Sequence, residues 1–153
     1  MRQVFFVASN FLLDKNNNIS FIEKEYQNED FYNISVVSFK MNEDKLIRNE
    51  IKIDEKRFLN LDLQLTAKDD ILLTGAYAID QNFGGSWEGI SSLKGLFCSL
   101  IDCKTNNVIV QYKKDIDTLI ANDKKTIFLG NANGFSFMVE DGKHLYGYRL
   151  KKV

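Results

Sequence analysis

Alternation of apolar and polar residues is the feature that most constrains how this chain can fold. Leucine occupies every second position from Leu59 to Leu65, and polar residues lie between the leucines. The same period of two recurs within residues 51–53, 108–112 and 146–150. Successive side chains of a β-strand point to opposite sides, so this period is typical of strands with one buried face. We therefore expect an all-β fold.

Polar clusters separate the alternating runs and predict turns between them. Each cluster lies between two strand-like runs, as expected of β-hairpins. The chain contains 15 Asn and no Pro. Its turns must therefore rely on Asn, Asp and Gly, which tolerate left-handed backbone conformations. The clusters are residues 14–18, 42–45, 67–70, 103–107 and 140–143.

These hairpins predict an antiparallel meander of about ten strands. A single β domain covering residues 1–153 accommodates them, since this is an ordinary domain length. Hydrophobic residues make up 44% of the chain, which is enough for a packed core. The expected strands are residues 3–13, 19–26, 32–41, 46–53, 58–66, 71–79, 93–102, 108–114, 126–139 (broken at 130–134) and 144–152.

A faint internal repeat groups the strands in fours. Residues 36–40 lead through a polar turn into residues 46–48, and residues 97–101 lead in the same way into residues 108–110. Four-stranded antiparallel units in series are typical of propeller blades, and a closed propeller needs at least about four of them. About two and a half blades fit this chain, which favours an incomplete propeller. A closed β-barrel or a sandwich is the alternative.

Two short glycine-aromatic motifs carry a resemblance to known proteins. Residues 74–77 read Thr-Gly-Ala-Tyr, and residues 94–97 read Lys-Gly-Leu-Phe. Over roughly residues 32–115 the chain resembles uncharacterised propeller-like β-repeat proteins of bacteria, which are often exported. In them a glycine-aromatic strand is followed by a Gly-Phe strand and a polar hairpin. The resemblance implies a propeller-like fold and brings no activity with it.

Charge and hydropathy argue against several classes of partner. The chain has 20 basic and 21 acidic residues, for a net charge of −1. Nucleic-acid binders usually carry a basic excess, because phosphate contacts supply much of their affinity, so we expect no nucleic-acid partner. No segment approaches the ~20 apolar residues of a membrane span, so we expect no membrane partner.

The N-terminus bears on localisation. Asn10 interrupts its apolar stretch, and a secretory signal needs a continuous apolar core. As written, the chain is therefore expected in the cytoplasm, and it would be exported if it is a fragment of a longer precursor.

One turn partly matches the calcium-binding loop of EF-hands. Asp14, Asn16, Asn18 and Glu25 fall at loop positions 1, 3, 5 and 12, where oxygen ligands are required. Position 6, which needs glycine for the sharp turn, is Ile19. The flanking segments also read as strands, where an EF-hand has helices. An ordinary hairpin turn is the favoured interpretation, and these four residues form a weak metal-site hypothesis.

The longest loop-like stretch, residues 81–89, contains the only tryptophan of the chain. Binding residues are common on loops held by a rigid scaffold. Phe83, Trp87 and Glu88 are therefore candidate ligand-binding residues for a sugar, a peptide or a partner. The favoured alternative is that Trp87 covers an edge of the core.

We predict no catalytic residue and no cofactor. The only histidine, His144, lies beside a turn, and no Gly-x-Ser-x-Gly motif is present. Cys98 and Cys103 would lie roughly 16 Å apart in a strand, beyond disulfide reach, so free thiols are expected.

Three functional hypotheses follow. The leading one is a non-enzymatic β-rich binding or scaffolding module. Its open sheet edges would meet a protein partner or a second copy of the chain, since unpaired edges are association sites. The second is a β-barrel that binds a small apolar ligand. The third is a carboxylate-based hydrolase, which needs two acidic groups about 5–10 Å apart in a pocket.

Overall fold

The computed structural model describes residues 4–28, 31–55, 58–78, 93–115, 125–131, 134–140, 145–149 and 151–152. Antiparallel strands make up most of these residues, which confirms the predicted all-β class. The helical element among them is a single 3-10 turn, η1 (Met41–Glu43), and no helix in the described ranges has the length and apolar character of a membrane span. The strands are β1 (Val4–Val7), β2 (Leu12–Leu13), β3 (Ile19–Asn28), β4 (Phe31–Lys40), β5 (Lys45–Ile51), β6 (Phe58–Leu65), β7 (Ile71–Ala78), β8 (Leu93–Ile101), β9 (Val108–Asp115), β10 (Lys125–Asn131), β11 (Gly134–Glu140), β12 (Leu145–Arg149) and β13 (Lys151–Lys152).

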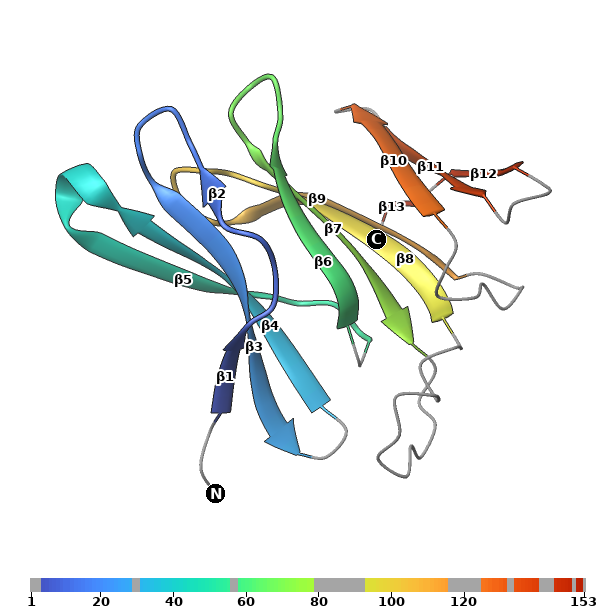
Figure 1. Cartoon of the computed structure of the whole chain (residues 1–153), viewed down its shortest axis with the longest axis horizontal. Coiled ribbons are helices and arrows are strands. Elements are labelled where there is room, and N and C mark those ends of the chain that lie inside the picture. The colour runs from blue at the N-terminus through green and yellow to red at the C-terminus, as the bar shows by residue number, and fades with distance from the viewer. Residues whose placement is uncertain are drawn as a thin grey trace.

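The strands form three antiparallel sheets. The first sheet has the order β1-β3-β4-β5, with β2 also paired to β3; the second has the order β13-β9-β8-β7-β6; the third has the order β10-β11-β12. In Figure 1 the third sheet lies on the far side of the second sheet from the first. In the part of the chain that the structure describes, no sheet closes on itself, so the closed-barrel alternative is wrong.

The expected first strand, residues 3–13, is divided by two polar residues. Ser9 leaves the sheet, and its hydroxyl oxygen accepts the backbone N–H of Ile22 at 2.8 Å. The side chain of Asn10 turns toward the second sheet. Its Nδ2 donates to the carbonyl of Leu63 at 2.9 Å, and its Oδ1 accepts the N–H of Leu63 at 2.8 Å. This amide therefore pairs with the outer edge of β6 as a peptide group of a neighbouring strand would.

The end of the chain also differs from the expected pattern. The break predicted at residues 130–134 is confirmed, because β10 ends at Asn131 and β11 begins at Gly134. The expected strand over residues 144–152 is instead two strands in different sheets. β12 completes the third sheet, and β13 pairs with β9 in the second sheet through Lys151–Lys113 and Lys152–Tyr112.

Left-handed Asn and Asp residues make the turns, as the lack of proline predicts. Asn17, Asp44, Asp69 and Asn106 have φ values of 61°, 47°, 64° and 59°. One of them lies in each of the first four expected turns. Short polar side chains reach this conformation at low cost, since they can form local hydrogen bonds. The fifth expected turn, residues 140–143, lies almost entirely outside the described residues.

One apolar core fills the space between the first and second sheets. A register shift between Leu59 and Asp62 interrupts the predicted alternation in β6 and brings Phe58 into this core. The inserted residue reverses the side on which the following side chains lie. The core residues are Ile22, Ile34, Val36 and Ile51 of the first sheet, and Phe58, Leu61, Leu63, Ile71, Leu73, Tyr77, Phe97 and Ile101 of the second.

The two glycine-aromatic motifs have a shared structural cause. Gly75 of β7 pairs with Phe97 of β8, and Tyr77 of β7 pairs with Gly95 of β8. A Cβ atom at Gly75 would lie 2.7 Å from the Phe97 ring, and one at Gly95 would overlap the Tyr77 ring. Each aromatic ring therefore lies across the glycine of the opposite strand. The phenol of Tyr77 thereby reaches Asp115 of β9 and donates a 2.7 Å hydrogen bond to it.

We expect Gly95→Ala to destabilise the fold more than Gly75→Ala. At Gly95 the new methyl group would meet the backbone carbonyl of Lys114 as well as Tyr77, whereas at Gly75 it meets only side chains. Overpacking of this kind costs about 1–3 kcal/mol, and the rigid backbone should place Gly95→Ala at the upper end. Urea unfolding of both variants measures the difference, and equal losses would contradict it.

Candidate functional site

The inner face of the second sheet changes from apolar to polar along one row of paired residues. Leu63 of β6 pairs with Leu73 of β7, which pairs with Ser99 of β8, which pairs with Gln111 of β9. Ser99 and Gln111 are both buried, and Gln111 Nε2 donates to Ser99 Oγ at 3.0 Å. The core thus ends on the β9 side of the sheet in polar groups.

The facing part of the first sheet contains a buried polar cluster. Ser20 and Ser38 are paired on β3 and β4, and their hydroxyl oxygens lie 2.7 Å apart. Asn106, in the turn between β8 and β9, reaches across to Ser38. Ser38 Oγ donates to Asn106 Oδ1 at 3.0 Å and accepts from Asn106 Nδ2 at 2.8 Å. All three side chains are buried, so this cluster joins the two sheets inside the molecule.

Two more side chains, Asn49 and Lys40, hold the turn between β8 and β9 against the first sheet. Asn49 Nδ2 donates to the carbonyl of Thr105 at 2.9 Å and to Asn107 Oδ1 at 3.1 Å. The ammonium group of Lys40 donates to the carbonyl of Cys103. The left-handed φ of Asn106 aims its side chain inward, and its neighbours in the turn remain at the surface. The turn therefore bridges the sheets at one end of the gap between β5 and β9.

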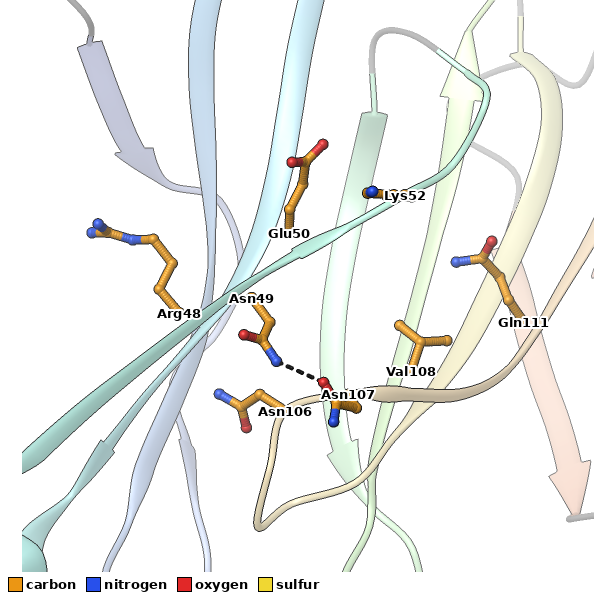
Figure 2. A pocket seen from close by; sticks show the side chains of 8 residues that line it. All are labelled: Arg48, Asn49, Glu50, Lys52, Asn106, Asn107, Val108 and Gln111. Atoms are coloured by element: carbon orange, nitrogen blue, oxygen red, sulfur yellow. Dashed lines mark hydrogen bonds between the residues drawn. The ribbon is translucent and has the colours of Figure 1, made fainter.

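A polar cleft of about 450 Å³ opens along this gap. This volume lies within the range of small-molecule and peptide-side-chain pockets. Figure 2 shows Asn49 directed from β5 toward Asn107, and Gln111 directed from β9 toward β5. The lining residues are Arg48, Asn49, Glu50, Lys52, Asn106, Asn107, Val108 and Gln111.

The cleft borders the edge strand of the first sheet. β5 is the last strand of that sheet and pairs with β4. The carbonyl of Ile47 accepts a 3.4 Å hydrogen bond from Asn106 Nδ2 at one end of the cleft. In an antiparallel strand the N–H and C=O groups of alternate residues point to the same edge. Because β5 has a partner strand on one side only, every second residue of β5 directs its backbone groups to the outer edge of the sheet.

The charged groups of the cleft are of both signs. Arg48 and Lys52 are basic, and Glu50 is acidic. Arg48 also forms an ion pair with Glu23, with Nε and Oε1 separated by 3.1 Å. Glu50 is the one carboxylate among the lining residues, so the cleft does not contain the acidic pair that glycoside hydrolysis needs.

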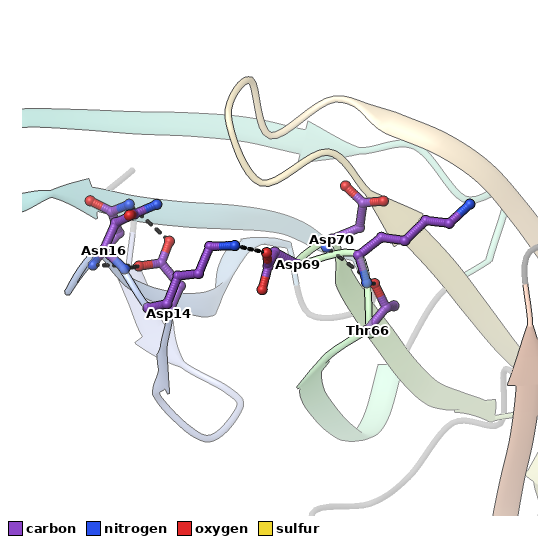
Figure 3. Close-up of polar contacts among 8 residues, drawn as sticks. Asp14, Asn16, Thr66, Asp69 and Asp70 are labelled. Carbon is purple, nitrogen blue, oxygen red and sulfur yellow. Dashed lines mark hydrogen bonds and ion pairs between the residues drawn. The ribbon is translucent and has the colours of Figure 1, made fainter.

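The structure brings together three of the four predicted calcium-loop residues, Asp14, Asn16 and Asn18. Asp14 Oδ1 accepts the backbone N–H groups of Asn16 and Asn18 at 2.8 and 2.9 Å, and Asp14 Oδ2 accepts Asn18 Nδ2 at 2.8 Å. Burial opposes ionisation of Asp14, but the hydrogen bonds from Asn18 and Asn16 outweigh it and lower the pKa. The carboxylate thus serves as a local turn cap. Figure 3 shows this turn beside the turn of residues 66–70, which it meets through the Lys15–Asp69 ion pair.

Glu25 lies too far along β3 to complete such a loop. Seven residues of strand separate it from Asn18, a span of roughly 23 Å. It pairs instead with Phe5 of β1 and Asn33 of β4. Within the described ranges, no three His, Cys, Asp or Glu residues are grouped so that they could hold a metal ion.

The predicted binding loop, with Phe83, Trp87 and Glu88, lies outside the described residues, and so does His144. The structure does describe the base of that loop. There the buried carboxylate of Glu55 accepts from Lys94 Nζ at 2.9 Å and from Lys113 Nζ. The hydrogen bond to Glu55 raises the pKa of Lys94. These ion pairs connect the segment after β5 to β8 and β9.

Both cysteines are free, as predicted. Cys98 is buried in β8, and burial raises the pKa of its thiol to about 12. Cys103 is partly exposed, and burial raises its pKa as well. A raised pKa disfavours the reactive thiolate form. Neither thiol has the character of a nucleophile.

Sequence reasoning missed the residues that build the cleft. Asn49, Asn106 and Gln111 were part of strand or turn patterns with no assigned role. A usable signal was present for Ser99, because Phe97 and Ile101 at neighbouring inward positions of its strand are apolar. Gln111 gave no such signal, since it shares its face with Lys113 and Asp115. No protein-family model, curated protein or solved structure matches this chain. The candidate site therefore rests on the geometry alone.

We expect Asn106→Gly to destabilise the protein by about 1–3 kcal/mol, because Ser38 would lose its hydrogen bonds to Asn106 in a buried setting and keep only Ser20 as a partner. Glycine adopts the left-handed backbone freely, so the substitution tests the side chain alone. Asn17→Gly is the matched control, since Asn17 has φ 61° but is exposed. Chemical denaturation should show a loss for the first variant and almost none for the second. Similar losses would contradict the role of Asn106.

The Asp102 turn should lose stability in acid. Hydrogen bonds from the backbone N–H groups of Thr105 and Lys104 lower the pKa of Asp102 below its ordinary value. Stability from such a group is present above the unfolded-state pKa and is lost as the pH falls through the folded-state pKa. The melting-temperature deficit of Asp102→Asn relative to wild type should therefore shrink between about pH 4 and pH 2.

Thr66→Val is the control for this pH series. Thr66 Oγ1 caps its own turn by accepting the N–H of Asp70 at 3.1 Å and has no charge to titrate. Its melting-temperature deficit should stay constant over the same interval. A constant deficit for Asp102→Asn would show that its carboxylate charge has no part in stabilising the turn.

Proposed function

We propose that this protein is a non-enzymatic binding module that holds an extended segment of a partner protein in the polar cleft. The observation that carries the proposal is the outer edge of β5, which borders a cleft of about 450 Å³. Extended peptides commonly bind proteins by adding a strand to an open sheet edge. Main-chain hydrogen bonds then supply affinity, and side-chain pockets supply specificity.

The chemistry of the cleft suits a peptide backbone. Alternate residues of β5 direct backbone donors and acceptors to its outer edge, and Asn49, Asn107 and Gln111 add side-chain amides nearby. Amides both donate and accept hydrogen bonds, as peptide groups do. Lys52 and Glu50 offer one charge of each sign to the side chains of the bound segment. Val108 supplies an apolar contact at the surface.

The two sheet edges that lie nearest to the core differ in a way that supports this assignment. On β6, Asn10 binds both backbone groups of Leu63, and Lys24 donates to the carbonyl of Phe58. That edge is therefore covered by the chain itself. At β5 the corresponding contact is a single 3.4 Å hydrogen bond from the side chain of Asn106 to the carbonyl of Ile47, at the end of the cleft. A partner strand would pair with the backbone groups that β5 directs outward.

Selection from a random peptide display library tests the proposal, with affinities of selected peptides measured by fluorescence polarisation. Gln111→Leu should weaken a selected peptide by tenfold or more, because a buried polar partner is lost. Gln64→Leu is the control, since Gln64 is exposed on β6. Failure to select any peptide, or equal affinity for both variants, would refute the assignment.

N-methylated peptides test the mode of binding. Methylation removes backbone N–H donors from alternate residues of the selected peptide. Only one of the two alternating sets should face β5, because the N–H groups of a strand point alternately to its two edges. Methylation of one set should therefore abolish binding and methylation of the other should leave it. Equal effects would show that the segment does not bind as a strand.

A further inference from the structure

The outer face of the first sheet, which points away from the second sheet, is unusually apolar. Residues paired across it include the row Leu13–Ile19–Phe39–Leu46 and the row Phe21–Val37–Arg48. Phe11 packs beside Phe21, with ring centroids 5.3 Å apart. Five apolar side chains of this face are between 47% and 64% exposed, namely Phe5, Val7, Phe11, Leu13 and Leu46. We call this set the outer patch.

Exposure to water does not explain why this face is so apolar. An antiparallel sheet with one face on the core normally presents polar residues to water on the other. The five side chains expose roughly 500 Å² of apolar surface, given about 150–200 Å² for each when fully exposed. Contiguous patches of this size on a single chain are commonly interaction sites.

We propose that the outer patch packs against the same patch of a second copy of this chain. Two copies related by a twofold axis would cover roughly 1,000 Å² of apolar side chain from the patch alone. Stable interfaces bury about 1,200–2,000 Å² in total, so the polar rim needs to add only a modest area. A self-complementary face therefore meets the size that a dimer requires.

The shape and charge of the face agree with a second copy. The first sheet already packs one face against another sheet of the same chain through a shared core. Face-to-face packing of two sheets is the ordinary way to cover a flat apolar surface. Arg48 lies over the ring of Phe5, with its guanidinium carbon 5.6 Å from the ring centroid, and pairs with Glu23. The face around the outer patch thus carries both signs of charge, and a second copy can place Arg48 near a carboxylate of its partner.

Sedimentation velocity over a range of protein concentrations tests the dimer. The wild-type chain should sediment as a dimer at micromolar concentration. Leu46→Lys should weaken dimer association at least tenfold, so that this variant sediments as a monomer at the same concentration. Leu46 is 54% exposed, so the change spares the core. Ile109→Lys is the matched control, since Ile109 is an apolar residue of the second sheet that is 53% exposed. It should leave the dimer intact.

Thermal unfolding followed by circular dichroism separates loss of association from loss of fold. At a concentration where the wild-type chain is monomeric, Leu46→Lys should melt within a few degrees of it. A wild-type chain that remains a monomer up to millimolar concentration would overturn the proposal. So would a dimer that survives Leu46→Lys, or one that Ile109→Lys disrupts. Because these readouts need no peptide, they are independent of the cleft assignment.

Discussion

The hydrogen-bonded cluster of Asn106, Ser38 and Ser20 fixes how the two main sheets sit against each other. Apolar packing between sheets has no preferred register, because dispersion and hydrophobic forces are not directional. A buried polar group must find its partner, and an error of one residue in alignment would leave it unsatisfied at a cost of about 1–3 kcal/mol. Asn106 reaches Ser38 from the far sheet, so this requirement aligns β8 and β9 with β3 and β4.

That alignment leaves the two sides of the shared core unequal. On the β6 side, Asn10 pairs with the backbone of Leu63 and closes the edge with groups of the chain itself. On the β5 side, Asn49 and Gln111 replace apolar residues at inward positions, and the cleft opens between them. The amide side chains explain the opening, because an inward-facing amide is compatible with water or with a ligand but not with a dry core.

The sequence could predict local features well and long-range polar contacts poorly. Alternation located the strands, and the many Asn and Asp residues located turns whose left-handed positions include Asn17 and Asp69. Neither pattern shows which polar side chain reaches another sheet. Asn10 was therefore predicted only to interrupt an apolar stretch, and Asn106 to be an ordinary turn residue. The paired roles of Gly75 and Gly95 were also hidden, because each depends on an aromatic ring about twenty residues away. The propeller-like arrangement and the binding role remain predictions.

The burial of adjacent residues, which lie on opposite faces of a strand, shows how far each sheet is covered on its two sides. In β8, Leu96 and Phe97 are adjacent residues on opposite faces, and both are buried, so the second sheet is covered on both sides. In β4, Val36 and Val37 are likewise both buried, but on the outer face Val37 pairs with the exposed Arg48, and the adjacent pair contains the exposed Leu46. The outer face of the first sheet is thus apolar, as in a sheet covered on both sides, but its apolar side chains are exposed. A layer with this composition is completed by another sheet, and that argues for assembly through the face as well as recognition at the edge.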